Sequence, residues 1–284
     1  MRILLTGSKG QVGSALLSAL APLGELIAFD RRSLDLLDSN SVKRRVETET
    51  PDIIINAASY TAVDRAEQEK EVAFAVNSQA VRELARAAKA IDALLIHFST
   101  DYVFDGAKPA PYVETDAPNP LGVYGRSKLE GERAVAASGC RHFIFRSSWV
   151  YAREGRNFVN AILAAAKTKP ELRVVSDQHG APTSNLAIAG AVARILSDAS
   201  VRQKPSGIYH LSAAGETTWH GFAREILESK KLDIRLTPVS TAEYGALAPR
   251  PKNSLLDNAK LRATFGISLA NWRDGFRAAM RAMH

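Results

Sequence analysis

Residues 2–13 read RILLTGSKGQVG, in which a short apolar run leads directly into a turn with three glycines. The apolar run predicts a buried strand, and the residues after the turn predict a helix. At such a junction Gly7 permits a tight turn, Gly10 lets a phosphate approach the backbone, and Gly13 lets helix and strand pack closely. Because the free N–H groups at a helix start attract anions, this stretch predicts a dinucleotide-binding turn.

The surrounding pattern strengthens this interpretation, since the spacing G-x-x-G-x-x-G by itself also occurs in ordinary turns. The first half of the chain alternates short apolar runs with helical patterns. The expected strands are 2–6, 25–29, 52–56, 94–99 and 142–147, and the expected helices are 11–20, 39–49 (capped by Ser39), 64–90 and about 120–137. Apolar strands that alternate with helices are typical of a parallel sheet covered on both faces. We therefore predict an α/β fold, a doubly wound parallel sheet of the Rossmann type.

After about residue 150 this alternation loosens into shorter elements joined by loops that contain glycine and proline. The expected helices there are 158–167, 186–197 and 218–229, and the loops include 177–184 and 244–253. We predict a dinucleotide-binding domain over residues 1–150. Residues 151–284 are expected to form mainly a smaller α/β substrate-binding lobe, with some later segments returning to the first domain.

Composition narrows the class of protein. The 284 residues include 37 Lys and Arg against 30 Asp and Glu, a formal charge of +7, and only one cysteine. A single cysteine excludes a disulfide scaffold and a cysteine-rich metal site. The apolar runs are too short to span a membrane. The basic residues are scattered, which indicates a solvated surface with a few cations for a small anion. We expect a cytoplasmic enzyme with no nucleic-acid or membrane partner.

Asp30 ends the second expected strand, 23 residues after Gly7. A carboxylate there can accept hydrogen bonds from an adenosine ribose and favours NAD, although aspartates at strand ends also cap turns. Arg31 and Arg32 follow directly, and an arginine there can pair with the 2′-phosphate of NADP. The sequence predicts NADPH or NADH as cofactor and does not choose between them.

Tyr124 and Lys128 have the spacing Y-x-x-x-K, which places both side chains on one face of a helix. A free phenol has a pKa near 10, and an ammonium about 4–6 Å away is expected to lower the pKa of Tyr124 by roughly 1–3 units. The pair alone also fits a half-buried aromatic beside a surface lysine. Thr100 lies just past the strand 94–99, at the sheet edge where ligands bind, and can hydrogen-bond a carbonyl. We predict that these three residues are catalytic.

Eight segments taken together resemble a known family. They are GSKGQVG at 7–13, NAASYTAVDRAE at 56–67, STDYVFDG at 99–106, PLGVYGRSK at 120–128, RSSWVYA at 146–152, DQHGAPT at 177–183, GIYHLSAAGETTWHGFA at 207–223 and RPKNSLLD at 250–257. On them the chain resembles the extended short-chain dehydrogenase/reductase family, and within it the dTDP-4-dehydrorhamnose reductases, over essentially its whole length. The resemblance implies hydride transfer from NAD(P)H to the 4-keto group of dTDP-4-dehydro-L-rhamnose, giving dTDP-L-rhamnose for cell-surface polysaccharide.

The same resemblance implies which residues bind. Together with Gly7, Gly13 and Arg31, which follow from the turn and the strand end described above, the residues predicted for the cofactor are Gly10, Gln11, Val12, Asp30, Asp35, Leu36, Ala57, Ala58, Ser59, Tyr60, Thr61, Tyr124 and Lys128. Those implied for the nucleotide-sugar are Thr61, Val63, Thr100, Asp101, Tyr102, Tyr124, Trp149 and Arg250. Arg250 is included because a guanidinium matches the geometry of a pyrophosphate, although an arginine between prolines also fits a solvated surface.

Two stretches depart from the family pattern. Some members bind Mg²⁺ at a dimer contact through carboxylates after the third glycine and after the A-P-T segment, where this chain has 14–15 (SA) and 184–186 (SNL). Since Mg²⁺ prefers carboxylate ligands, we expect no metal site. The protein is expected to be a monomer or a homodimer.

Two alternative functions remain open. The first is another nucleotide-sugar reductase or epimerase; a dehydratase is disfavoured because Tyr102 stands where dehydratases carry an acidic residue. The second is a non-catalytic regulatory subunit that binds a dinucleotide. The intact set of Thr100, Tyr124 and Lys128 argues against the second.

Overall fold

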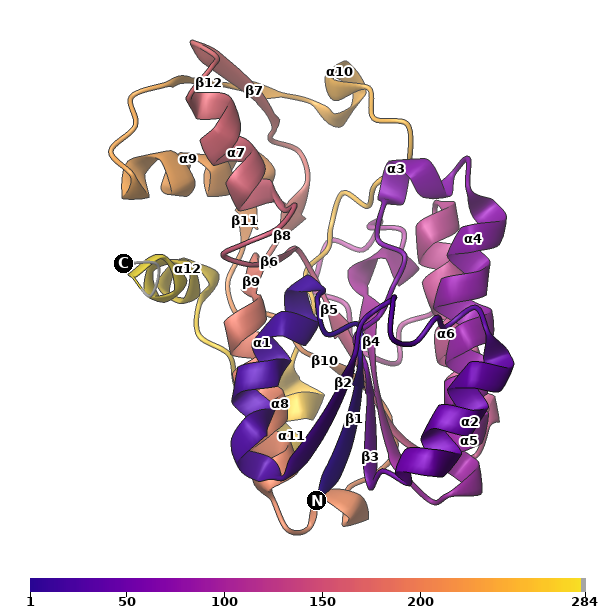
Figure 1. The fold of residues 1–284 in the computed structure, drawn as a ribbon. Coiled ribbons are helices and arrows are strands. Elements are labelled where there is room, and N and C mark those ends of the chain that lie inside the picture. Colours follow the sequence, from indigo (N-terminus) through magenta and orange to yellow (C-terminus); the bar gives the residue numbers. More distant parts are fainter. Residues whose placement is uncertain (282–284) are drawn as a thin grey trace.

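A six-stranded parallel sheet forms the centre of the protein (Figure 1). The computed structural model describes residues 1–281. The sheet order is β2-β1-β3-β4-β5-β10, formed by β1 (Arg2–Thr6), β2 (Glu25–Phe29), β3 (Ile53–Asn56), β4 (Leu94–Thr100), β5 (Arg141–Ser147) and β10 (Gly207–His210). All neighbouring strands are parallel. The predicted doubly wound α/β fold is confirmed.

Helices cover both faces of this sheet (Figure 1). One face carries α1 (Gln11–Leu20), α8 (Asn185–Ser197) and α11 (Ala259–Phe265); the other carries α2 (Ser39–Glu49), α5 (Ala80–Ala90) and α6 (Val123–Ala137). Successive strand residues point to opposite faces, so Ile3 and Leu5 enter one core cluster and Leu4 the other. Burial on both faces explains why the strands read as unbroken apolar runs.

The strand order reverses between β1 and β3. From β1 the chain moves to β2 on one side, and it then crosses to β3 on the other side. Ligands of open α/β sheets bind at such a switch point, beyond the carboxyl ends of the strands. The turn that follows β1 therefore lies at the expected binding edge.

Some late segments pack on this sheet. Helix α8 lies against α1, and β10 extends the sheet beside β5, with Ile208 opposite Ile144. Both elements lie beyond residue 150 in the sequence. A boundary at residue 150 stays a prediction.

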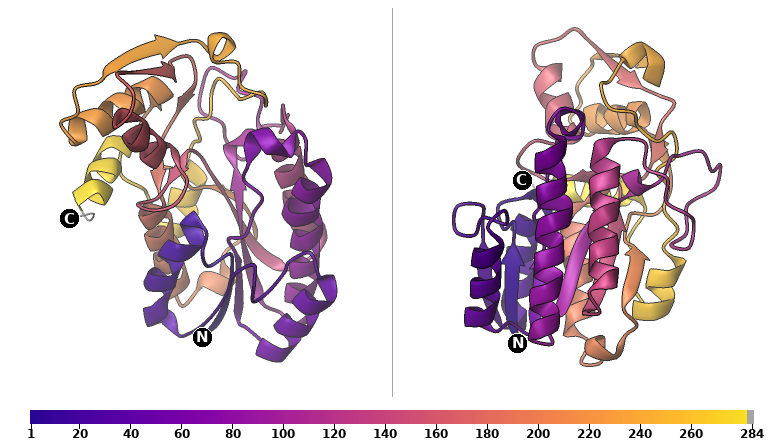
Figure 2. Two further views of the ribbon diagram at one scale, coloured as in Figure 1. Left: turned by 45° about the horizontal axis from the view of Figure 1, so that its top comes forward. Right: turned by 90° about the vertical axis from the view of Figure 1, so that its right-hand side faces the viewer.

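The remaining elements lie above the carboxyl ends of the strands (Figures 1 and 2). They are β6 (Val150–Tyr151), α7 (Phe158–Ala166), β7 (Glu171–Val175), β8 (His179–Gly180), β9 (Thr183–Ser184), β11 (Thr217–Thr218), α9 (Trp219–Ser229), β12 (Arg235–Val239), α10 (Thr241–Tyr244) and α12 (Trp272–Arg281). Phe222 and Phe276 lie at the centre of their own apolar cluster. Short 3-10 turns occupy Ala21–Leu23, Asp101–Val103 and Val201–Gln203. Within residues 1–281 no helix is both long and apolar enough to cross a membrane.

The single helix expected over 64–90 is wrong in detail. The structure has α3 (Val63–Ala66), α4 (Lys70–Phe74), a π-helical turn at Ala75–Gln79, and then α5. The π turn contains Asn77, whose amide bonds to the loop at Tyr60 and to α6, and tertiary contacts of this kind override the local helical pattern.

A second expectation, that Ser39 caps α2, is also wrong. The Asp38 side chain caps this helix by accepting from the backbone N–H of Ser41. Both residue types are good caps, and only the backbone geometry decides which one precedes the first helical residue.

Candidate active site

A cavity of about 1090 Å³ lies at the carboxyl ends of the central strands and is lined by both parts of the chain. Most residues predicted for the site line it: Gly7, Gly10, Gln11, Val12, Asp30, Arg31, Asp35, Leu36, Ala57, Ala58, Ser59, Tyr60, Thr61, Val63, Thr100, Asp101, Tyr102, Tyr124, Lys128 and Trp149. Among the described residues that the sequence predicted, Gly13 and Arg250 do not line it. One cavity thus unites segments that are far apart in the sequence.

The glycine turn forms one wall because its backbone leaves no room for side chains. Gly7 has a φ of 71°, and a Cβ on it would lie 2.5 Å from the amide nitrogen of Ala58. A Cβ on Gly13 would lie 2.0 Å from the carbonyl oxygen of Gly7. Gly13 therefore acts through packing beneath the turn, while Gly7 and Gly10 border the cavity itself.

The loop after β3 is held rigidly against the turn. The Asn56 side chain accepts hydrogen bonds from the Thr6 hydroxyl (2.7 Å) and from the amide of Ala58 (3.2 Å). Further along, the Asn77 amide accepts from the Tyr60 backbone N–H at 2.8 Å and donates to the Ser127 hydroxyl at 3.0 Å. Asn77 therefore ties this wall of the cavity to helix α6, a role that the sequence did not reveal.

Asp30 borders the opposite end of the cavity, where the sequence placed the adenosine. Its Oδ1 accepts from the backbone amides of Arg32 and Ser33 and from the Ser33 hydroxyl, each at 3.0 Å. Its Oδ2 pairs with the ammonium of Lys9, and together these donors hold the pKa of Asp30 far below its usual range. Asp30 therefore both caps a turn and faces the cavity.

Tyr124 and Lys128 project from α6 at the other end of the cavity, where Lys128 is buried and Tyr124 is half-buried. The Lys128 ammonium donates to the Phe98 carbonyl at 2.5 Å, and burial lowers the pKa of this lysine to about 8. Burial also raises the pKa of Tyr124 to about 12, an effect that a hydrogen bond with Thr100 partly offsets. Thr100 ends β4 directly beside the phenol.

The expectation that Lys128 lowers the pKa of Tyr124 is wrong for this structure. Burial of the phenol and the neighbouring carboxylate of Asp101 raise the pKa of Tyr124. The ammonium of Lys128 is directed to the carbonyl of Phe98 instead. The phenol therefore keeps its proton at neutral pH. Such a group suits the donation of a proton rather than its removal from a substrate.

Helix α6 carries a third charged group one turn beyond Lys128. Glu132 forms a bidentate pair with Arg146 of β5, with N–O distances of 2.8 and 2.6 Å, and both side chains are almost completely buried. The Glu132 carboxylate also raises the pKa of Lys128 and so opposes the effect of burial. The pair therefore joins helix α6 to strand β5 one helical turn away from Lys128.

Asp101 and Tyr102 follow Thr100 and line the same end. Burial raises the pKa of Asp101 to about 6, and its Oδ2 has no hydrogen-bond partner within residues 1–281. The Tyr102 ring meets the Tyr124 ring edge-on, with centroids 5.6 Å apart. These groups surround the phenol with polar atoms that a ligand can use.

Trp149 stacks on Trp219, with ring centroids 3.6 Å apart and an angle of 9° between the planes. Both rings line the cavity, and Trp149 has a φ of 48°, uncommon outside glycine. A Cβ on Gly180 would lie 2.4 Å from the Trp149 ring, so a glycine is needed behind it. Trp219 was missed as a site residue, although it stands in the segment TTWHGFA.

Arg250 makes a different contact from the one expected. Its guanidinium donates to the Asp64 carboxylate at 2.8 Å and to the Ala248 carbonyl at 2.8 Å, which holds the segment before Pro251 against α3. These two bonds direct the guanidinium to its own loop and to α3, and Arg250 does not line the cavity. A clamp role for Arg250 stays a prediction that this geometry does not support.

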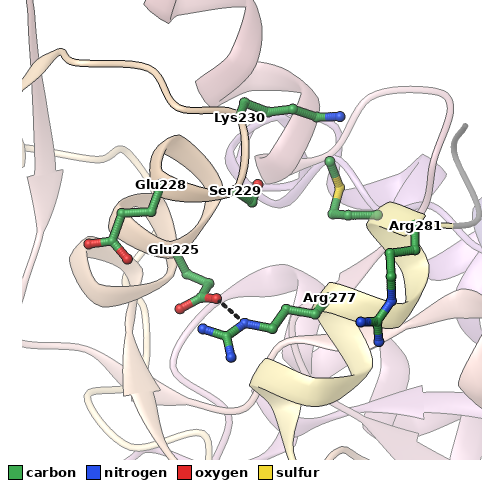
Figure 3. A pocket seen from close by; sticks show the side chains of 7 residues that line it. Glu225, Glu228, Ser229, Lys230, Arg277 and Arg281 are labelled. Carbon is green, nitrogen blue, oxygen red and sulfur yellow. Dashed lines mark hydrogen bonds and ion pairs between the residues drawn. The ribbon is translucent and has the colours of Figure 1, made fainter.

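A smaller cavity of about 340 Å³ lies between α9 and α12 (Figure 3). Two of its charged lining residues, Glu225 and Arg277, form an ion pair at 2.8 Å, and Glu225 also pairs with Arg273 at 2.9 Å. Among residues 1–281, no group of three or more His, Cys, Asp or Glu side chains is arranged to hold a metal ion. The larger cavity is the candidate active site.

Comparison with known proteins places the chain in a family. A family model described as the RmlD substrate binding domain matches residues 1–284. Two curated dTDP-4-dehydrorhamnose reductases are similar throughout: that of Sinorhizobium fredii is 45% identical over 100% of this chain and 98% of its own, and that of Burkholderia thailandensis is 44% identical over 96% of each. The chain belongs to this family.

Solved structures of the reductase family agree with this assignment. A dTDP-4-dehydrorhamnose reductase from Bacillus anthracis, crystallised with NADP, superposes with a TM-score of 0.94 at 34% identity, and 99% of each chain is covered. An orthologue from Clostridium acetobutylicum has a TM-score of 0.95 at 35% identity over 100% of this chain and 99% of its own. The resemblance inferred from the sequence, to an oxidoreductase family that uses a nicotinamide cofactor, is confirmed.

Proposed function

We propose that this protein is a dTDP-4-dehydrorhamnose reductase. It transfers a hydride from NADPH or NADH to the 4-keto carbon of dTDP-4-dehydro-L-rhamnose and forms dTDP-L-rhamnose, a precursor of cell-surface polysaccharide. The single observation that carries the proposal is one cavity that joins the glycine turn to Thr100, Tyr124 and Lys128. Membership of the RmlD family supports the same substrate.

The residues present fit a dinucleotide cofactor. The turn at Gly7 and Gly10 leaves a cradle that a Cβ would fill, and Gln11 and Val12 open α1 with free backbone N–H groups toward the cavity. These groups would hold the pyrophosphate, with Ala57–Tyr60 beside it and Asp35 and Leu36 toward the adenine. When bound, the dihydronicotinamide supplies the hydride.

Tyr124 donates the proton that completes the reduction. As the 4-keto oxygen gains negative charge, the phenolic hydroxyl gives its proton to that oxygen, and the product is a neutral alcohol. Burial keeps Tyr124 protonated before the step, and the hydrogen bond with Thr100 favours the phenolate afterwards. Lys128, which lines the same cavity, would hold the nicotinamide ribose. The hydroxyl of Thr100 orients and polarises the carbonyl.

The nucleotide-sugar occupies the part of the cavity near the two stacked tryptophans. Asp101 and Tyr102 are placed to bond the sugar, and the stacked rings of Trp149 and Trp219 border this part of the cavity. Thr61 and Val63 lie at the junction between sugar and cofactor. Two further proposals from the sequence, a cytoplasmic location and a monomer or homodimer, are tested by cell fractionation and by light scattering.

The decisive experiment is a reduction assay with purified protein. dTDP-4-dehydro-L-rhamnose is supplied with NADPH or NADH, and oxidation is followed by the near-ultraviolet absorbance of the reduced cofactor. We expect dTDP-L-rhamnose to form in step with oxidation, identified by mass and by its proton spectrum. No oxidation with either cofactor refutes the proposal and favours the non-catalytic binding subunit, whereas activity only with another keto-sugar assigns a different reductase.

A further inference from the structure

The adenosine end of the cavity has a carboxylate that the protein itself already satisfies. Both oxygens of Asp30 are engaged: Oδ1 closes the turn to Arg32 and Ser33, and Oδ2 pairs with Lys9. In a site for NAD, such a carboxylate accepts hydrogen bonds from the free 2′-hydroxyl of the ribose, and it repels a 2′-phosphate. Here the negative charge of Asp30 is compensated before any ligand arrives.

The other charged groups at this end are few. Arg31 lines the same cavity and forms no ion pair among residues 1–281. Asp35 also lines the cavity, and one of its oxygens accepts from the amide of Leu37 at 3.0 Å. Two cations therefore balance two carboxylates, whereas without Lys9 the carboxylates would outnumber the single cation.

We propose that Lys9, together with Arg31, makes this end of the cavity select a 2′-phosphate, so that the protein prefers NADPH to NADH. The inference rests on the proposed function in one respect, that the cavity is the cofactor site. It adds the choice between the two cofactors, which the sequence left open.

Lys9 can reach a phosphate without disturbing the fold. Its side chain is 77% exposed, whereas that of Asp30 is 15% exposed and tied to its own turn through Oδ1. The ammonium can therefore leave Oδ2 for a dianionic phosphate while the three bonds to Oδ1 stay in place. A phosphate carries more negative charge than a carboxylate, so the exchange is favourable.

The test measures binding of two adenosine fragments, adenosine 2′,5′-bisphosphate and adenosine 5′-monophosphate, by isothermal titration to the full-length protein. We expect the wild type to bind the bisphosphate at least about tenfold more tightly than the monophosphate. Lys9→Ala should remove about tenfold of this preference and change the affinity for the monophosphate by less than about twofold. Lys9→Arg should retain it.

Lys43→Ala is the matched control. Lys43 is also exposed and also pairs with a carboxylate, Glu47 at 3.8 Å, but it lies on α2 outside the cavity. Its loss changes the net charge of the protein by the same amount and should leave both affinities unchanged. If Lys9→Ala and Lys43→Ala lose the preference for the bisphosphate equally, the preference depends on the net charge of the protein and not on the position of Lys9. That result would overturn the proposal.

Two other outcomes overturn it as well: equal binding of the two fragments by the wild type, or an unchanged preference in Lys9→Ala. Neither measurement needs a sugar substrate or hydride transfer. A protein that shows the expected fragment preference but reduces no keto-sugar would therefore refute the proposed reductase and still support the role of Lys9.

Discussion

Two lysines in one cavity are placed in opposite environments. Lys128, at the catalytic end, is 2% exposed and donates to a single backbone carbonyl. Lys9, at the adenosine end, is 77% exposed and pairs with Asp30 beside solvent. Burial lowers the pKa of Lys128 to about 8, because a charge without water is poorly stabilised.

The two ends of the cavity control charge in different ways. At the catalytic end, low polarity and close packing set the protonation of Tyr124 and Lys128 and strengthen every charge interaction. At the adenosine end, water screens the ion pair, so the cation is free to change partners. Changes at the buried end should therefore alter catalysis and stability strongly, and changes at the exposed end should alter ligand choice alone.

The largest effect is expected from Tyr124→Phe. Removing the phenolic hydroxyl removes the proton donor, and turnover should fall by roughly 10²–10⁴-fold. The ring remains, so packing against Tyr102 and the affinity for the adenosine fragments should change little. Steady-state rates and fragment titration measure both quantities. A variant that reduces substrate at a rate near that of the wild type would exclude Tyr124 as the donor.

Glu132→Gln should give the largest loss of stability. It leaves the guanidinium of Arg146, 1% exposed, without its counter-charge, and breaking a buried pair in this way costs about 3–5 kcal/mol of the free energy of unfolding. Urea denaturation measures the change.

The matched variant is Glu130→Gln, which breaks the exposed pair with Arg133 on the same helix. We expect no measurable loss there, since water already solvates both groups. Similar losses in the two variants would show that burial of the Glu132 pair has no special effect on stability.

The pH dependence of catalysis should reveal Lys128. Because its pKa is lowered, the folded protein loses this proton above about pH 8. The logarithm of kcat/KM for the cofactor should therefore fall by one for each pH unit above that pH. Lys128→Arg keeps the charge to much higher pH. Any activity that this variant retains should therefore lack the alkaline limb, and an unchanged limb would assign the titration to another group.

The smallest effect is expected for the stability of Lys9→Ala. The ion pair with Asp30 lies beside solvent, and the turn keeps its three bonds to Oδ1. The urea midpoint should not move within experimental error. A clear loss of stability would mean that Lys9 supports the glycine turn, and the fragment titration would then need the Lys9→Arg variant as its reference.

Much of the fold could be predicted because its signals are local. The strands Arg2–Thr6 and Glu25–Phe29 have the predicted bounds because each contains a short apolar run, and the helix Gln11–Leu20 follows its own periodicity. The division of 64–90 could not be predicted, because the contacts of Asn77 with Tyr60 and Ser127 come from distant segments. The cap of α2 at Asp38 depended on backbone geometry at a single residue.

The candidate site shows the same contrast between local signals and tertiary contacts. The glycine turn, the pair Tyr124 and Lys128, and Thr100 can be identified from the amino-acid sequence, because their spacing and order are local features of the chain. Their contacts and protonation follow from the folded structure. It stacked Trp219 on Trp149, paired Lys9 with Asp30, and raised rather than lowered the pKa of Tyr124. Desolvation and ion pairing depend on what surrounds a group in space, and no local stretch of sequence specifies that.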